Sequence, residues 1–562
     1  MAAPSPATEE LKGNQGEDWN LVRMKGKEGK GPRVGIIGAG VSGLAACKHF
    51  SQRGLNVTVL EAKSGIGGIW RHTYASTALQ TSRRLFEYSD FPWPESASEF
   101  PMHQDVMEYL EGYTQRFGLL DKIQFNCQVV HIRRGNSVAT DFSWYALKDR
   151  NLTADEDLAL KDAKSALWEV RVKKKILDST DSSHFSEESY EFDFLVLCCG
   201  CFGDLPSVPS YPEKEGPEVF LGQVLHSLEY SSLDPKKLSE LLDGKKVVVV
   251  GFGKTALDIV TEVANAQKAG SGGTCIMLFR RTHWMFPHQM PMAFGYIPFM
   301  YLCYTRFGEL FAPKPNQGIL QRILQFLFRP LRWIMWKTVE YSIRNLVPLF
   351  KLGILPDHSL IEDISGCMIP SLPVGFVPHL ENGSIIPVKT PSFSFCPQGL
   401  LLGDGKKVEA DTVLLCTGYN AQEKLKAILP ITARESVFEK DETLSLYRGL
   451  VHPKIPGLGI LGYREGLSTT HSAELGAVWL AHLIRGQFSL PDHATMQKDM
   501  SKWWEYRKTV TPLYNRPCIG SVEIWHYDTL CKDMGVSRNA QKLSWWNSLF
   551  SIPSIKNYKL TD

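Results

Sequence analysis

The chain has 562 residues, more than one hydrophobic core usually organises, so we expect at least two domains. Hydrophobic residues make up 43% of it, which is enough for a large core and excludes a generally disordered chain. With 62 basic and 60 acidic residues, the net charge of +2 gives no reason to expect nucleic acid as a partner.

The cysteines and the N-terminal segment indicate a reducing compartment. Twelve cysteines are too dilute for a disulfide scaffold, so we expect reduced thiols, and we interpret the cluster Cys198, Cys199 and Cys201 as ordinary buried positions. The polar residues 1–32 lack a signal-type apolar block and predict a disordered lead-in. No apolar stretch is long enough and free enough of charge to suggest a membrane-spanning helix. We therefore expect a cytoplasmic protein.

Residues 33–62 predict a βαβ unit with a glycine-rich turn. Apolar strands at 34–37 and 57–60 flank a helix-like stretch that ends at Gly54. The turn has the GxGxxG pattern, in which glycines permit the tight turn, the approach of a pyrophosphate and close helix packing. An acid at the end of the second strand can accept hydrogen bonds from a ribose. The residues expected to hold this first dinucleotide are Gly38, Ala39, Gly40, Ser42, Gly43 and Glu61.

Residues 245–281 repeat the design with different charge. The strands at 247–250 and 274–279 enclose a GxGxxA turn, but two arginines, Arg280 and Arg281, stand where the first unit has its acid. Arginines favour the 2′-phosphate of NADPH, which an acid would repel, although they could instead only solvate the strand end. The residues expected at this second site are Gly251, Gly253, Lys254, Thr255, Ala256, Arg280 and Arg281.

Two further strands share a pattern of Asp, apolar residues, Cys and Gly, at 193–200 and 411–418. We interpret each as closing a nucleotide-binding region. The sequence thus predicts an α/β fold of two Rossmann-like dinucleotide-binding domains, with the second domain inserted into the first. The predicted boundaries are 33–205 and 411–490 for the first domain, 206–410 for the second with an insertion at about 286–350, and 491–562 for a C-terminal extension.

The stretch FLGQVLHSLEY at 220–230 carries the strongest resemblance. Its FxGxxxHxxxY pattern, with GIGGIW at 65–70, SDFPWP at 89–94 and LLCTGY at 414–419, resembles the flavin-containing monooxygenases. The resemblance runs from about 33 to 490 and looks closest to the plant branch. Tyr230 stands where the related Baeyer–Villiger enzymes carry Trp.

The resemblance implies FAD at the first site, with Gly68 and Trp70 as further contacts, and NADPH at the second. In this family NADPH reduces the flavin, which forms a C4a-hydroperoxide with dioxygen and oxygenates a nucleophilic nitrogen or sulfur of a small molecule. The resemblance also implies that Gln80 has the place of a flavin-side Asn, as the catalytic residue, and that His226 is architectural. An alternative is that Gln80 faces away from the flavin.

Several alternatives remain open at this point. Within the family the same chemistry could decarboxylate a 2-oxo acid; outside it, a disulfide reductase or a non-enzymatic flavin protein would share the fold. We identify no metal-ligand, Ser/His/Asp or paired-carboxylate set. The sequence indicates neither the substrate nor the oligomeric state.

Two local expectations concern later segments. Residues 319–350 combine aromatic, apolar and basic side chains around Pro330. We expect them to pack on the NADPH domain and wall a substrate tunnel; contact with a membrane surface, such as that of the endoplasmic reticulum, is the alternative. Farther on, Ser472 is expected to cap a helix that has Glu474 in its first turn.

Overall fold

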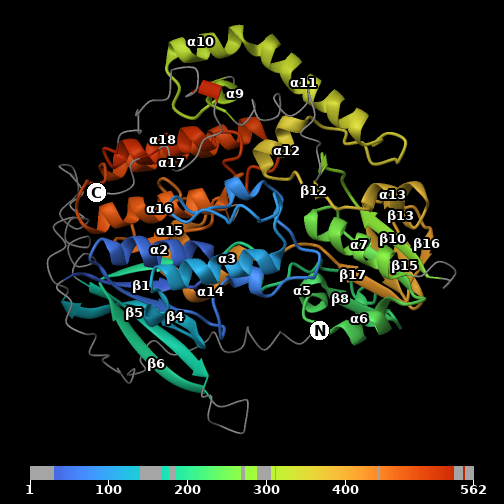
Figure 1. Ribbon diagram of the computed structural model, residues 1–562, viewed down its shortest axis with the longest axis horizontal. Helices are drawn as coiled ribbons and strands as arrows, with labels where there is room; N and C mark the ends of the chain where they lie inside the picture. The colour runs from blue at the N-terminus through green and yellow to red at the C-terminus, as the bar shows by residue number, and fades with distance from the viewer. Residues whose placement is uncertain are drawn as a thin grey trace.

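The computed structural model describes residues 31–138, 166–175, 185–267, 273–287, 305–310, 312–439, 443–536, 549–550 and 558. Two parallel five-stranded sheets with flanking helices form its two halves (Figure 1), which confirms the predicted α/β fold. Residues 1–30 of the expected lead-in and residues 288–304 of the expected insertion lie outside the described residues.

The first sheet has the strand order β18-β7-β1-β2-β3. The strands are β1 (Arg33–Ile37), β2 (Asn56–Leu60), β3 (Ile123–Gln124), β7 (Phe194–Leu197) and β18 (Leu458–Ile460). Valine and isoleucine side chains of β1 and β2 are buried on both faces, as expected for a parallel sheet covered by helices. Since β18 pairs with β7 from far along the chain, the first domain is discontinuous.

Helices α2 (Val41–Gln52), α3 (His103–Arg116) and α16 (Thr469–Ile484) cover this sheet, and α16 packs against α2. The predicted cap of α16 is wrong. Ser468, not Ser472, is the N-cap, and its side chain accepts a hydrogen bond from the backbone N–H of His471. Glu474 lies fully inside the protein, where it binds His49 at 2.9 Å and Ser89 at 2.7 Å. Glu474 is therefore placed where it is by its buried partners His49 and Ser89, and not by an interaction with the dipole at the helix start.

The second sheet, inserted between β7 and β18 in sequence, has the order β13-β10-β9-β17-β8. Its strands are β8 (Gln223–His226), β9 (Lys246–Val250), β10 (Thr274–Phe279), β13 (Ile385–Lys389) and β17 (Thr412–Leu415), with helices α5 (Ser227–Tyr230), α6 (Pro235–Leu242), α7 (Lys254–Ala266) and α13 (Phe376–Glu381). Residues 256, 259, 260 and 263 of α7 are fully buried at helical spacing, as predicted.

The pairing of β17 moves one predicted domain boundary. Its residues pair with β9 on one side and β8 on the other, so β17 is an inner strand of the second sheet. The boundary expected at 411 is therefore too early, and the chain returns to the first sheet only after β17. The Asp-to-Gly pattern shared by 193–200 and 411–418 correctly predicts one strand in each sheet. The pattern does not indicate to which sheet each strand belongs.

Smaller elements complete the two halves. Antiparallel sheets are formed by β4 (Cys127–Val138), β5 (Ala166–Lys175) and β6 (Phe185–Phe192), and by β14 (Phe393–Cys396), β15 (Gly399–Leu402) and β16 (Lys407–Glu409). The short strands β11 (Phe286–Pro287) and β12 (Ser371–Leu372) pair with each other, and α14 (Ala421–Ile428) and α15 (Ile431–Val437) follow β17.

The insertion extends past its predicted end at about 350 as far as β12, and it contains α9 (Arg306–Leu310), α10 (Ile319–Leu327), α11 (Arg329–Leu346) and α12 (Leu360–Gly366). Pro330 lies in the first turn of α11, so the predicted break is confirmed. The C-terminal half of α11 packs on the second domain through Val339 and Ile343, but α10 does not pack there. None of the described residues 312–350 lines the large cavity, but Ala312 and Trp336 line a small pocket that shares Leu467 with it, so the role as a tunnel wall stays a prediction. In the described part of the chain, no helix has the length and apolar character needed to cross a bilayer.

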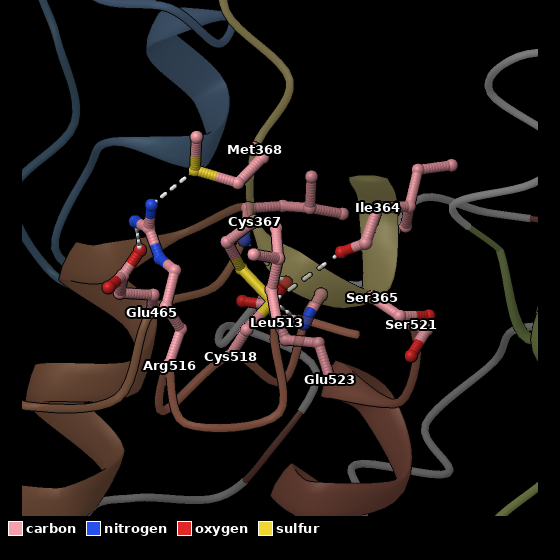
Figure 2. Close-up of a disulfide and its surroundings, with 12 residues drawn as sticks. Ile364, Ser365, Cys367, Met368, Glu465, Leu513, Arg516, Cys518, Ser521 and Glu523 are labelled. Carbon is pink, nitrogen blue, oxygen red and sulfur yellow. Dashed lines mark hydrogen bonds and ion pairs between the residues drawn. A yellow bond between two sulfur atoms is a disulfide. The ribbon is translucent and has the colours of Figure 1, made fainter. Parts of the chain in front are cut away.

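The C-terminal extension folds into α17 (His493–Val510) and α18 (Glu523–Asp533) and is bonded to the insertion. A disulfide joins Cys367, at the end of α12, to Cys518, in the loop between α17 and α18 (Figure 2). The expectation of reduced thiols is therefore wrong for these two cysteines. They lie 151 residues apart, so no local spacing could have revealed the pair. The nine other cysteines among the described residues are not disulfide-bonded.

Candidate active site

One large cavity, of about 4210 Å³, lies where the two sheets meet. The turns after β1 and β9 open into it, together with the ends of β7, β10 and β17. Ligands of α/β folds bind at the carboxyl ends of parallel strands, where the helix N-termini gather. The two predicted dinucleotide sites therefore face one shared space.

The first glycine turn has two kinds of glycine. Gly38 has a φ of +103°, and an added Cβ would lie 2.6 Å from the carbonyl oxygen of Cys198. At Gly43 the added Cβ would lie 1.9 Å from the carbonyl oxygen of Gly38, so this position allows the close helix packing. Gly40, in contrast, has a φ of −80°, and its nearest neighbour would be the Cα of Gly68 at 3.7 Å. The protein needs glycine at 38 and 43 for its own packing, but not at 40.

Glu61 directly follows β2 beside this turn and is 6% exposed. Its carboxylate accepts hydrogen bonds from the backbone N–H of Ala39 at 2.6 Å and of Lys63 at 2.8 Å. A carboxylate has about four acceptor positions, so two remain for a ribose in the cavity. Glu61 thus holds the turn in shape and still lines the cavity.

Ser42, Gly68 and Trp70 also line the cavity, whereas Ala39 and Gly43 are buried behind its wall. Ser42 lies in the first turn of α2, close to Gly462, and Gly68 begins the short 3-10 helix Gly68–Arg71. The ring of Trp70 packs edge-on against Phe86 at 5.4 Å between centroids, so it connects the cavity wall to the core.

The second turn repeats the first. Gly251 has a φ of +141°, and an added Cβ would lie 2.6 Å from the carbonyl oxygen of Cys416. Gly253 has a φ of −79°, and an added Cβ would find no atom within 4 Å. Thr255 lines the cavity, whereas Ala256 is fully buried beneath it. As at Gly40, the glycine at 253 serves something other than the protein's own packing.

Lys254 is held in a network that joins the two domains. Its ammonium group pairs with Asp258 at 2.5 Å, and Asp258 also accepts a hydrogen bond from Tyr74 of the first domain at 2.8 Å. Burial raises the pKa of Asp258 to about 6. A second bridge runs from the backbone N–H of Ser76 to Glu262, which also binds Tyr230 of the family motif. These contacts fix one domain against the other at the cavity edge.

Arg280 and Arg281 are exposed and line the cavity just after β10. The chain then turns inward, where Asp363 binds His283 at 3.0 Å, His358 at 2.9 Å and the backbone N–H of Trp284 at 2.8 Å. The ligand atoms of these two histidines and Asp363 lie within 4.8 Å of one another, a grouping that could hold a metal ion. Sequence reasoning missed this cluster because its members come from two segments. Its hydrogen bonds anchor the segment that carries the two arginines.

His226 serves the backbone in this structure. Its Nδ1 accepts a hydrogen bond from the backbone N–H of Leu228 at 3.2 Å, and Glu229 closes the capping box at the start of α5. Burial lowers the pKa of His226, which favours the neutral ring that this acceptor role needs. Gly222 lets β8 approach Asp411, whose carbonyl oxygen would lie 2.3 Å from an added Cβ. The motif thus secures an edge strand of the second sheet.

Gln80 is exposed at the cavity, between the two domains. Its Oε1 accepts a hydrogen bond from the backbone N–H of Ser371 in β12, at 3.4 Å. This single contact reaches from the first domain to the insertion and leaves the amide N–H₂ able to donate toward the cavity.

The C-terminal extension also contributes to the cavity wall, which sequence reasoning did not predict. Residues 515–517 and Gly520 line the cavity, and Arg516 binds both Glu465 and the sulfur of Met368 (Figure 2). Cys198 and Cys201 lie three residues apart, the offset of a dithiol motif, yet both are free. The Cys201 thiol donates to the carbonyl oxygen of Gly462. Burial raises the pKa of Cys199 between them to about 11, so this thiol is protonated at neutral pH.

The N-termini of the helices at the cavity show whether it could bind the phosphates of a dinucleotide. Helices α6, α16 and α17 begin at Asp234, Ser468 and Asp492, whose side chains accept hydrogen bonds from the first backbone N–H groups. Helices α2 and α7 begin at glycines, have no side-chain cap and no acid in the first turn, and open into the cavity. Such helix starts offer N–H donors and a positive dipole end to an anion. The residues present therefore fit two dinucleotides.

Comparisons with a family model and with individual proteins point to the same family. A family model described as flavin-binding monooxygenase-like matches residues 31–164 and 163–327. A protein of Arabidopsis thaliana named probable flavin-containing monooxygenase 1 is 36% identical over 537 residues, covering 94% of this chain and 96% of that protein.

Solved structures share the fold. S-allyl-L-cysteine S-oxygenase from Allium sativum matches with a TM-score of 0.55 at 19% identity, covering 92% of this chain and 91% of that one. The complex of OTEMO with FAD and NADP matches with a TM-score of 0.59 at 18% identity, covering 90% and 97%. The family model spans more than half of the chain, and the Arabidopsis relative nearly all of it. This chain therefore belongs to the flavin-containing monooxygenase family and is an FAD- and NADPH-dependent enzyme with plant-type relatives.

Proposed function

We propose that the enzyme transfers one oxygen atom from dioxygen to a nucleophilic nitrogen or sulfur of a small molecule. The observation that supports this most is that two uncapped, glycine-started helices of separate domains open into one cavity. FAD bound there supplies the redox chemistry, by accepting a hydride from NADPH and activating dioxygen. The chain supplies binding, orientation and exclusion of water.

In this proposal the first site, with Gly40, Ser42 and Glu61, holds FAD, and the second, with Gly253 and Thr255, holds NADPH. Arg280 and Arg281 pair with the 2′-phosphate. Their position after β10 and their exposure to the cavity support this assignment. Lys254 is less suited to a phosphate, because Asp258 already neutralises it.

Gln80 is proposed as the polar group that serves the reacting oxygen. Its support is its place in the cavity between the domains, with an N–H₂ group available to donate. A substitution series tests the role. Gln80→Ala should consume NADPH at a near-normal rate but release more hydrogen peroxide per oxygenated product, while Gln80→Asn should lie between Gln80→Ala and wild type. Unchanged coupling in Gln80→Ala would remove the residue from the reaction.

Oxygen transfer itself is tested with purified protein, NADPH and isotopically labelled dioxygen, offered panels of amines, thioethers and 2-oxo acids. We expect an amine or thioether product heavier by one labelled oxygen atom. Carbon dioxide released from a 2-oxo acid, without an N- or S-oxygenated product, would instead favour oxidative decarboxylation. The family membership leaves the disulfide reductase and the non-enzymatic flavin protein without support.

A further inference from the structure

Helices α10 and α11 lie on the outer edge of the molecule (Figure 1). They expose many large apolar side chains. Ile319 is 80% exposed and Phe326 is 73% exposed. We name the whole set the apolar ridge, and it consists of Ile319, Leu320, Ile323, Leu324, Phe326, Leu327, Phe328, Leu331, Trp333 and Ile334. Soluble surfaces scatter such side chains singly, and a contiguous set marks an interaction site.

The orientation of α10 is inverted relative to an ordinary surface helix. At 3.6 residues per turn, its apolar residues 319, 320, 323, 324 and 327 share one side, and Gln321 and Gln325 lie on the other. The polar side faces the protein, because Gln325 donates to the carbonyl oxygen of Ala312 at 2.9 Å and accepts from Arg332 at 3.2 Å. Surface helices normally bury their apolar side. In α10 that side points to the surroundings and needs an apolar occupant.

The basic residues around the apolar ridge indicate which kind of surface could cover it. Residues 319–346 contain five basic residues and one acid, Glu340. Glu340 is buried, where it pairs with Lys337 and accepts from the backbone N–H of Leu360. Arg322 and Arg329 are exposed among the apolar residues. A second copy of the ridge would bring the same cations and no acid, whereas an anionic lipid surface offers both apolar depth and negative charge.

We propose that the apolar ridge docks the enzyme onto anionic membrane surfaces, with α10 lying in the plane of the lipid interface. No residue of either helix lines the large cavity, and only Trp336 of α11 reaches a small pocket beside it. The apolar ridge is therefore a surface separate from the two predicted cofactor sites. Docking also explains why an 18-residue helix carries several charges and yet leaves Trp333 and Ile334 more than half exposed.

The proposal is tested by sedimenting the full-length, FAD-loaded protein with vesicles of phosphatidylcholine, alone or mixed with phosphatidylserine. We expect binding to the mixed vesicles, weaker binding to phosphatidylcholine alone, and release as salt is added. The double variant Ile319→Gln/Phe326→Gln should lower the partition coefficient at least tenfold, because two inserted apolar side chains are lost. Arg322→Gln and Arg329→Gln should each lower it roughly fivefold on mixed vesicles only.

A matched control removes equally exposed apolar residues elsewhere. Leu221 and Val374 are 84% and 70% exposed on the second domain, so Leu221→Gln/Val374→Gln should bind vesicles as wild type does. Retained yellow colour shows that each variant is folded. The proposal is overturned if wild type stays in solution with mixed vesicles at low salt, or if both double variants bind equally. A dimer in light scattering that only Ile319→Gln/Phe326→Gln dissociates, without vesicle binding, would assign the ridge to a second copy.

Discussion

The glycines at the two turns separate into those that the protein needs and those that a ligand needs. Gly38 and Gly251 have positive φ angles, and Gly43 has no room for a side chain. Gly40 and Gly253 have ordinary negative φ angles and room for a Cβ. Sequence pattern alone assigns all of them to one motif. The structure adds that substitutions at 40 and 253 should disturb the ligand more than the fold.

Gly40→Val and Gly253→Val therefore form a reciprocal pair. The branched side chain should occupy the space of the pyrophosphate at its own site and leave the other site intact. We expect Gly40→Val to purify colourless, and Gly253→Val to purify yellow but to need at least tenfold more NADPH for half-maximal flavin reduction. The unfolding temperature of Gly40→Val should lie within a few degrees of that of FAD-free wild type. The unfolding temperature of Gly253→Val should lie within a few degrees of that of FAD-bound wild type. A yellow Gly40→Val would refute the first assignment, and normal NADPH use by Gly253→Val the second.

Arg280 and Arg281, the proposed partners of the 2′-phosphate, should determine the choice between NADPH and NADH. A charge-assisted pair between a guanidinium and the 2′-phosphate is worth about 1.5 to 3 kcal/mol. Loss of one pair should raise the NADPH Michaelis constant roughly ten- to a hundredfold. NADH, which lacks this phosphate, is the internal control and should hardly change. Flavin reduction by both cofactors is measured for Arg280→Ala, Arg281→Ala and the double variant. Equal losses with both cofactors would make the arginines structural.

At the scale of elements, the sequence predicts best where local pattern and tertiary structure agree. The strand predicted at 274–279 matches β10, and the one at 247–250 matches β9 to within a residue, because both are apolar runs that follow a turn glycine. The cap of α16 was misplaced because Ser472 and Glu474 imitate a helix start. In the fold, the packing against α2 and the buried pair of Glu474 with His49 extend that helix backward to Ser468.

The network of Asp258, Lys254 and Tyr74 predicts a pH dependence at the domain junction. Burial raises the pKa of Asp258 from 3.8 to about 6, so the folded protein binds this proton more tightly than the unfolded chain. The contribution of the proton to stability is complete below 3.8 and is lost as the pH rises through about 6. Stability measured by chemical denaturation should carry this falling component, and Asp258→Asn should remove it. Identical pH profiles for Asp258→Asn and wild type would contradict the shifted pKa.

At the scale of the whole molecule, the C-terminal extension packs against the two domains and lines the cavity. No sequence motif predicts this arrangement. Glu523 accepts hydrogen bonds from the backbone N–H groups of Leu467 and Ser468, just before α16. Arg448 pairs with Asp499 and Asp533 of the extension. These contacts join residues that are far apart in sequence, and periodicity carries no information about such pairs. The family resemblance, which ends near residue 490, could not reveal them either.

The disulfide between Cys367 and Cys518 ties this extension to the insertion at the rim of the cavity, where Arg516 and Met368 flank it (Figure 2). It closes a loop with a sequence separation of 151 residues, and cross-links of long loops typically stabilise by about 2 to 5 kcal/mol, chiefly by restricting the unfolded chain.

We therefore expect the double variant Cys367→Ser/Cys518→Ser to unfold at a lower temperature than wild type. A thiol reductant should lower the wild-type value toward that of the variant and leave the variant unchanged. Cys396→Ser, which removes a free and partly buried thiol, is the matched control and should keep both the wild-type stability and its response to reductant. Thiol titration of the unfolded, unreduced wild type should find two fewer reactive groups than after reduction. If the counts are equal, the cross-link does not form, and the extension is held by its ion pairs alone.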